Sequence, residues 1–238
     1  MSLGNNGTWP SRAGVVQGSE SGKALEVFIM RSPCTALSAS RKEEKQTKKT
    51  EKKKSAMNVG TWNVRTMMRA GKLENIKREM EKCRIDILGL CEVRWKDCGD
   101  YWSDGYRVIY SGGDESQRGV ALVLNKKLGK RVVGIDQVSD RILAVEIEAR
   151  PTNLVVVQVY MPTSNHKEED VDGVYEQIEE IIRETPGRKN LVVMGDWNAV
   201  VGEGRDGNEI GEYGLGLRND RGDKAVEFCR RNKLFITN

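Results

Sequence analysis

Polar side chains that could do chemistry directly follow a short apolar run in this sequence. Residues 191–194 are Leu-Val-Val-Met, and Gly195, Asp196, Trp197 and Asn198 come next. Side chains alternate along an extended chain, so Asp196 and Asn198 should point to the same side. Open α/β sheets bind ligands outside the carboxyl ends of their strands, where a carboxylate can hold a cation or activate a water. The alternative is a strand that simply ends in an Asx turn.

Three other apolar runs end in a polar residue in the same way. They deliver Asn63 after residues 57–62, Glu92 after residues 86–91 and Tyr160 after residues 153–159. If these strands end at one edge of a sheet, the three side chains form one cleft with Asp196 and Asn198. Two carboxylates with carboxamides make an oxygen-rich site. Such a site suits Mg²⁺ or Mn²⁺ better than zinc, because zinc prefers Cys and His.

The order of these motifs resembles the endonuclease/exonuclease/phosphatase superfamily. The motifs are Thr-Trp-Asn (61–63), Cys-Glu-Val-Arg (91–94), Tyr-Met-Pro (160–162) and Gly-Asp-Trp-Asn (195–198). Segments 60–67 and 214–222 are similar to the apurinic-type endonuclease domains of RTE-clade retrotransposons, and the resemblance covers about residues 57–238. It implies a four-layer α/β/β/α sandwich, in which two mixed sheets lie face to face with helices outside.

The resemblance also implies a role for each residue of the cleft. Glu92 would be the principal metal ligand, and Asn63 would support the metal and the phosphate. Tyr160 would hydrogen-bond the scissile phosphate, while Asp196 would orient or deprotonate the attacking water. Asn198 would help to stabilise the pentacovalent centre. In-line attack on a phosphodiester needs these functions, so the implied activity is that of a Mg²⁺- or Mn²⁺-dependent DNA endonuclease.

One departure from the family bears on activity. The family's last motif, Ser-Asp-His, does not occur, and the printed sequence ends at residues 235–238, Phe-Ile-Thr-Asn. The chain's only histidine, His166, follows Tyr160 in a polar segment and is predicted to be an exposed loop side chain. We therefore expect a C-terminally truncated domain over 57–238 with weak or no turnover, because losing one member of a catalytic unit costs several powers of ten.

Two other functions remain open at this point. The first is a catalytically inactive module that binds nucleic acid or protein, which the missing motif favours. The second is another enzyme of the superfamily, such as a phosphatase that acts on a lipid or inositol headgroup. The segments Trp-Asn-Val-Arg (62–65) and Leu-Arg-Asn-Asp-Arg-Gly (217–222) favour the nuclease over the phosphatase.

Basic and aromatic residues near the motifs are candidates for nucleic-acid contacts. Arg94 ends the motif that contains Glu92 and Trp95 directly follows it, so they could bind a phosphate and stack on a base. The alternative for Trp95 is an anchor that packs on the sheet, since aromatic side chains mostly bury area. Arg65 and Arg118 are further candidates for phosphate contacts.

Composition and charge indicate a globular domain with a basic extension. The chain has 238 residues, of which 38% are hydrophobic and 31% charged, and its five cysteines form no C-x-x-C pair. Residues 1–56 are predicted to be disordered, and residues 41–54 hold eight basic and three acidic residues. This run could be a solvated linker, a phosphate-binding tail or a nuclear address. The sequence contains no apolar leader and no apolar run long enough to span a membrane, so we expect an intracellular protein that could enter the nucleus. Its expected partner is DNA rather than a membrane.

Apolar periodicity predicts the elements that carry these residues. Stripes at helical spacing predict helices over 66–83, 168–184 and 223–232. Runs rich in β-branched residues predict strands over 106–111, 118–125, 131–136, 141–149 and 153–160. Residues 126–130 and 151–153 are predicted to be hairpin connections.

Overall fold

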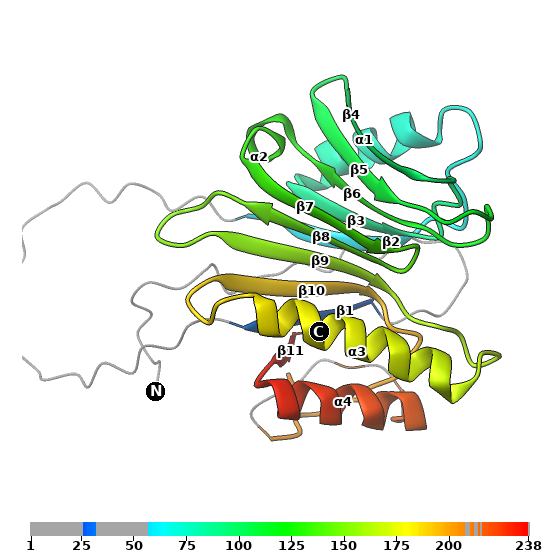
Figure 1. The fold of residues 1–238 in the computed structure, drawn as a ribbon, viewed down its shortest axis with the longest axis vertical. Coiled ribbons are helices and arrows are strands. Elements are labelled where there is room, and N and C mark those ends of the chain that lie inside the picture. Colours follow the sequence, from blue (N-terminus) through cyan, green and yellow to red (C-terminus); the bar gives the residue numbers. More distant parts are fainter. Residues whose placement is uncertain (1–25, 32–56, 208–209, 212–213, 215, 238) are drawn as a thin grey trace, which may run out of the picture.

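Two β-sheets lie face to face in the computed structural model, with helices outside both (Figure 1). The structure describes residues 26–31, 57–207, 210–211, 214 and 216–237, and only the backbone of the first range. One sheet contains β1 (Glu26–Arg31), β7 (Val132–Ser139), β8 (Ile142–Ile147), β9 (Leu154–Tyr160), β10 (Asn190–Asp196) and β11 (Phe235–Thr237). The other contains β2 (Val59–Asn63), β3 (Ile87–Cys91), β4 (Cys98–Ser103), β5 (Tyr106–Ser111) and β6 (Val120–Leu124).

Both sheets are mixed. The strand orders are β11-β1-β10-β9-β8-β7 and β2-β3-β6-β5-β4. Within them β9 and β10 run parallel, as do β2 and β3, whereas the other neighbouring strands pair antiparallel. The predicted four-layer sandwich of two mixed sheets is confirmed. Its two parallel pairs end at one edge, which is where the sequence predicted the cleft.

Four helices with described boundaries cover or link the sheets. They are α1 (Lys72–Cys83), α2 (Lys126–Gly129), α3 (Glu168–Glu184) and α4 (Asp220–Asn232). α1 packs Ile76 and Met80 onto the five-stranded sheet, and each such burial stabilises the fold by about 1.5–3 kcal/mol. α3 and α4 cover the six-stranded sheet through Tyr175, Phe228 and their apolar neighbours. None of the helices within the described ranges is long and apolar enough to cross a membrane.

The predicted helices agree with the structure except at their starts. α3 has the predicted boundaries, 168–184. α4 begins at Asp220, three residues earlier than predicted, because the Asn219 side chain accepts a hydrogen bond from Gly222 N–H and caps the helix. α1 begins only at Lys72, because Gly71 adopts a left-handed conformation (φ 77°) and the preceding residues form a loop at the site edge.

One predicted hairpin is wrong and the other is confirmed. Lys126–Gly129 form α2, capped by Asn125, within the connection from β6 in one sheet to β7 in the other. Apolar alternation on both sides of a connection does not reveal whether the strands share a sheet, so the sequence could not separate these cases. Residues 151–153 do connect the antiparallel neighbours β8 and β9.

β1 is a strand within the range predicted to be disordered. Its backbone pairs antiparallel with both β10 and β11, between which it lies. The segment Val-Phe-Ile is a strong β-former, and an uncovered edge of β10 would otherwise leave backbone groups without partners. The prediction of disorder is therefore wrong at Glu26–Arg31, which form a strand. The rest of residues 1–56, with the basic run 41–54, lies outside the described residues, and the boundary at residue 57 stays a prediction.

Gly195 sets the approach of β10 to β9 at the site. It pairs with Val159 in the parallel register and has φ 148°, a conformation that L side chains rarely adopt. A Cβ on Gly195 would meet the Val159 carbonyl oxygen at 1.8 Å. Because the next pair in the register is Asp196 with Tyr160, this close approach places two site residues side by side.

We expect Gly195→Ala to lower the free energy of unfolding by about 2–4 kcal/mol, through steric conflict and backbone strain. The matched control is Gly173→Ala in α3, where an added Cβ meets no atom within 4 Å. That change should stabilise the protein by about 0.5–1 kcal/mol, because alanine is the better helix former. Urea unfolding of both variants checks the prediction, and equal midpoints would contradict it.

Candidate active site

The polar residues predicted to meet do so at the carboxyl ends of β2, β3, β9 and β10. Asn63 Nδ2 donates hydrogen bonds to Glu92 Oε1 at 2.9 Å and to Asp196 Oδ2 at 2.8 Å. The distance between these two carboxylate oxygens therefore cannot exceed the summed lengths of the two hydrogen bonds. Asn63 and Glu92 come from one sheet and Asp196 from the other, so the amide joins the sheets at this edge.

Tyr160 belongs to the same cluster, and Asn198 supports it from the side. The Tyr160 hydroxyl donates to Glu92 Oε1 at 3.3 Å. Asn198 N–H donates to Asp196 Oδ1 at 3.1 Å, which is the Asx turn that the sequence left open as the alternative, while its side-chain amide donates to the Met161 carbonyl at 2.8 Å. The Asn198 side chain therefore braces the β9–β10 edge in this arrangement, and its predicted role at the reacting phosphorus stays a prediction.

The backbone around the site is unusually strained. Glu92 (φ 56°), Arg94 (φ 59°), Arg65 (φ 58°) and Asn198 (φ 44°) all adopt left-handed conformations without being glycine. Each such residue costs about 1–3 kcal/mol and persists only where its surroundings enforce it.

The two carboxylates have opposite pKa shifts. Burial disfavours the charge on Glu92, but hydrogen bonds from Asn63 and Arg94 outweigh burial and lower its pKa. Burial raises the pKa of Asp196, and the nearby charge of Glu92 raises it further, against the hydrogen bonds from Asn63 and Asn198. Burial also raises the pKa of Tyr160, followed in importance by the charge of Glu92, so the phenol stays protonated and can donate.

A buried polar layer lies directly below the cluster. Gln158, in the apolar run of β9, is fully buried between the sheets and donates to Thr61 Oγ1 at 3.1 Å and to Cys91 Sγ at 3.0 Å. Each of these residues precedes a site residue by one or two positions on its strand. The layer ties β2, β3 and β9 together beneath the site, as supporting shells do for binding residues. Sequence reasoning missed it, although a glutamine inside a Val-rich strand was a visible signal.

Arg141 is a second residue that the sequence analysis missed. Its guanidinium donates to the Tyr160 carbonyl at 3.1 Å and lies over the Tyr160 ring, 5.3 Å from the centroid. The same group contacts His166 Nε2 at 3.2 Å, and His166 Nδ1 is 2.9 Å from Thr163 Oγ1. His166 is therefore a half-buried partner of Arg141 rather than the exposed loop residue that was predicted. An arginine at the start of a buried strand was the available signal.

The four predicted nucleic-acid contacts have different environments. Arg94 donates to Glu92 Oε2 at 3.0 Å, and Arg118 pairs with Asp140 at 3.3 Å. The Arg65 backbone N–H donates to Asn63 Oδ1 at 3.1 Å. Trp95 is half-buried against the outer core and packs edge-on to Tyr110 at 4.9 Å, as an anchor would. Their contacts with DNA stay predictions.

The donor set fits a hard divalent cation. No cluster of three or more His, Cys, Asp or Glu occurs among the residues described. The converging oxygens of Glu92 and Asp196 match Mg²⁺, which usually binds one or two carboxylates and takes its other ligands from water and substrate phosphates. The ligand role predicted for Asn63 stays a prediction, because its carboxamide oxygen here accepts from Arg65 N–H.

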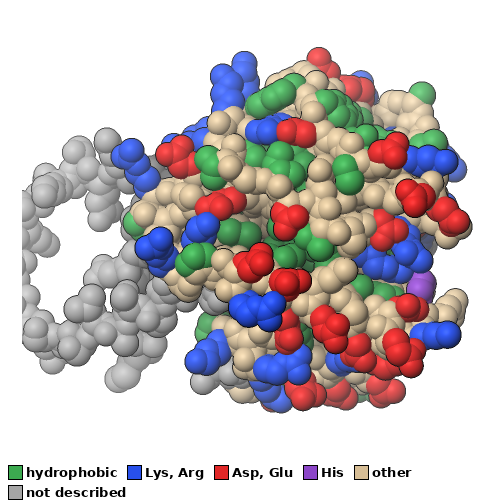
Figure 2. Space-filling view, in the orientation of Figure 1, with side chains coloured by type: hydrophobic (Ala, Val, Ile, Leu, Met, Phe, Trp, Pro, Cys, Tyr) green, Lys and Arg blue, Asp and Glu red, His purple; other side chains and the backbone are tan. Residues whose placement is uncertain are grey.

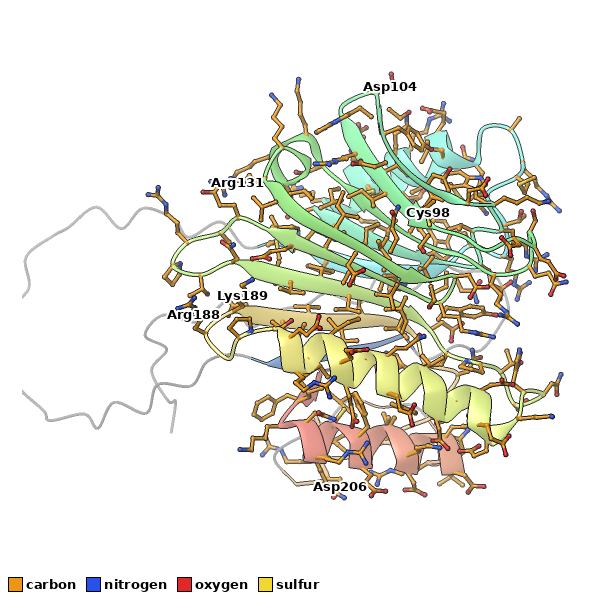
Figure 3. The ribbon with its side chains drawn as sticks, in the orientation of Figure 1. Cys98, Asp104, Arg131, Arg188, Lys189 and Asp206 are labelled. Atoms are coloured by element: carbon orange, nitrogen blue, oxygen red, sulfur yellow. The ribbon has the colours of Figure 1, made fainter. Side chains whose placement is uncertain are left out.

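Charged side chains also gather on other parts of the surface. Acidic side chains gather over α3 and α4 (Figure 2). Arg131, Arg188 and Lys189 lie at the opposite end of the sheets, where β10 begins (Figure 3). The basic residues at the site edge are thus separated from these three.

Asp196 and Glu92 should affect stability in opposite directions. The raised pKa of Asp196 means that its ionisation lowers stability as pH rises from the unfolded value of 3.8 to the folded value. The lowered pKa of Glu92 means that its ionisation stabilises the folded protein. This stabilisation is fully present above the unfolded-state pKa of 4.5 and is lost as pH falls through the folded-state pKa.

In the metal-free protein, we expect the carboxyl carbon NMR signal of Asp196 to titrate with a midpoint above 3.8. Glu92→Gln should lower that midpoint, because it removes the neighbouring negative charge. Asp196→Asn identifies the signal by its loss. A midpoint that Glu92→Gln leaves unchanged would show that the two carboxylates are not coupled.

The chain is similar in sequence to known proteins. The sequence pattern of the endonuclease/exonuclease/phosphatase family matches residues 60–209. Craniofacial development protein 2 of Bos taurus is 41% identical over 181 residues, which are 76% of this chain and 30% of the relative. The chain thus spans about a third of that relative's length.

Two solved structures share the fold. The endonuclease domain of TRAS1, a telomere-specific non-LTR retrotransposon, superposes with a TM-score of 0.53 at 19% identity, over 73% of this chain and 69% of that one. The AP endonuclease LMAP from Leishmania major gives 0.52 at 14% identity, over 72% and 65%. At these identities the likeness concerns the fold.

Proposed function

This chain belongs to the endonuclease/exonuclease/phosphatase family, and we propose that it hydrolyses phosphodiester bonds in DNA with the aid of Mg²⁺ or Mn²⁺. The observation that carries the proposal is the cluster in which Asn63 bridges Glu92 and Asp196 while Tyr160 donates to Glu92. Nucleases of this family generally use divalent metal ions. Segments 60–67 and 214–222 and the fold shared with the TRAS1 domain support descent from a retrotransposon endonuclease.

Glu92 would hold the cation, with Asn63 and Asp196 beside it. When bound, the ion would supply a Lewis acid for the negative charge that develops on the phosphate. Glu92 is suited to this position because its lowered pKa keeps it ionised at neutral pH.

Asp196 is the best candidate to orient or deprotonate the attacking water. It is 2% exposed, and Asn63 and Asn198 hold both of its oxygens. Its raised pKa makes it a stronger base than an ordinary aspartate, which favours proton transfer from water.

Tyr160 would bind the phosphate, and Arg141 would position Tyr160. The Tyr160 phenol stays protonated, so it can donate to a phosphate oxygen. Arg141 holds the Tyr160 backbone and covers its ring, which fixes the direction of the hydroxyl. The acidic face over α3 and α4 would repel DNA and favour its approach at the site edge.

We expect the chain to nick supercoiled plasmid only weakly in Mg²⁺, because the Ser-Asp-His motif does not occur in the sequence. Glu92→Gln and Asp196→Asn should reduce that rate by about a hundredfold or more. Tyr160→Phe removes one donor and should cost about ten- to a hundredfold. Arg188→Met, at the far end of the sheets, is the matched control and should nick at the wild-type rate. Nicking that survives both carboxylate substitutions would come from a contaminant and would refute the proposal.

A second candidate is a module that binds nucleic acid without cutting it. It is favoured by the position of the chain's only histidine, His166, which contacts Arg141 and Thr163 instead of the carboxylates. If the wild-type chain nicks nothing, but binds DNA with an affinity that falls steeply with salt, this second function replaces the first.

A further inference from the structure

Glu92 divides its two oxygens between different partners. Oε1 accepts from Asn63 and Tyr160, on the side of the second carboxylate. Oε2 accepts from the Arg94 guanidinium at 3.0 Å. The site thus already contains one positive charge in contact with the residue proposed to hold a cation.

We propose that Arg94 is an exchangeable counter-ion: it neutralises Glu92 in the metal-free site, and it transfers to a DNA phosphate when a divalent cation takes Glu92. The inference rests on the proposed function, and it assigns Arg94 to coupling between the cation and the nucleic acid. Arg94 would then weaken cation binding and strengthen DNA binding.

The exchange needs only the side chain of Arg94 to move, because the backbone at this position is held by hydrogen bonds. Arg94 N–H donates to the Arg118 carbonyl at 2.7 Å, and Val93 N–H donates to the Gly119 carbonyl at 3.1 Å. Val93 itself is fully buried. The left-handed turns at Glu92 and Arg94 direct both side chains to the same edge, where the Arg94 side chain is 43% exposed.

Arg94 also has hydrogen-bonding capacity that Glu92 does not use. Its Nε is buried and has no hydrogen-bond partner. An arginine has five N–H donors in a planar fork that matches a phosphate, and an unsatisfied buried donor is costly. A phosphate oxygen at the edge would satisfy Nε, which Glu92 in this geometry does not.

Charge distinguishes Arg94 from the neighbouring arginine. A divalent cation at Glu92 would repel a guanidinium in contact with the same carboxylate. The backbone carbonyl of Arg118 accepts a hydrogen bond from Arg94 N–H, but the Arg118 side chain pairs with Asp140. Substitution of Arg118 therefore removes a charge from the same edge without releasing Glu92.

Binding of Mn²⁺ alone tests the first half of the inference, with the electron paramagnetic resonance signal of the free ion as the readout. We expect Arg94→Met to tighten Mn²⁺ binding about two- to fivefold, since a half-exposed ion pair of this kind contributes up to about 1 kcal/mol. Arg94→Lys keeps the charge and should stay close to wild type. Arg118→Met should change the affinity less than twofold, and thermal unfolding confirms that each variant is folded.

Binding of a short labelled DNA duplex tests the second half of the inference. Binding is measured once in EDTA and once in saturating Mg²⁺, on a wild-type and a Glu92→Gln background. In wild type, Mg²⁺ should strengthen DNA binding more than it does in Arg94→Met, because the released guanidinium then contacts a phosphate. Arg188→Met controls for the loss of one positive charge and should keep the wild-type response.

The outcomes separate the inference from the proposed function. If Glu92→Gln abolishes Mn²⁺ binding but Arg94→Met binds no more tightly than wild type, the counter-ion role is wrong and the cation site stands. If Glu92→Gln leaves Mn²⁺ binding unchanged, both the cation site and the counter-ion role are wrong. Tighter Mn²⁺ binding together with a weaker Mg²⁺ response of DNA binding in Arg94→Met supports the exchange.

Discussion

The amide of Asn63 makes the contact on which the rest of the site depends. It donates to Glu92 from its own sheet and to Asp196 from the facing sheet. Without a donor between them, two carboxylates at a largely buried edge would repel each other with little solvent to screen the charge. A single neutral side chain thereby holds the two carboxylates at one edge and joins the ends of the two sheets.

The surrounding structure maintains this arrangement against a clear energetic cost. Asp196 is buried with a raised pKa, and several residues at the edge have left-handed backbones. Functional sites often retain such strain, which the rest of the fold offsets. Here the offset comes from the inter-sheet core and from the outer layers beneath α1, α3 and α4. A stable scaffold thus holds a site that is itself destabilising.

Supporting contacts reach the site from below and from the side. Gln158 links three strands under the cluster, and Arg141 holds Tyr160 by its carbonyl and its ring. Neither residue contacts the carboxylates. Both determine where the contacting residues point, which is why catalytic geometry depends on side chains that a motif search passes over.

The amino-acid sequence by itself identified most of the helices and strands and the residues of the cluster, whereas the layers of the fold were implied by the resemblance to the family. Apolar alternation and helical stripes identify elements such as β9 and α3, because those patterns express local burial on one or both faces. A polar residue at the end of an apolar run likewise marks a site such as Glu92, since the position along the strand sets where it is delivered.

Tertiary structure alone decided the contacts between distant segments. Which sheet receives the chain after α2, and the pairing of β1 with β10, depend on partners far away in the sequence. The same holds for Arg94 on Glu92 and for His166 on Arg141, because the direction of a long side chain depends on backbone turns and on neighbouring charges. Local patterns report burial, whereas the choice among competing polar partners is made only when the two sheets meet.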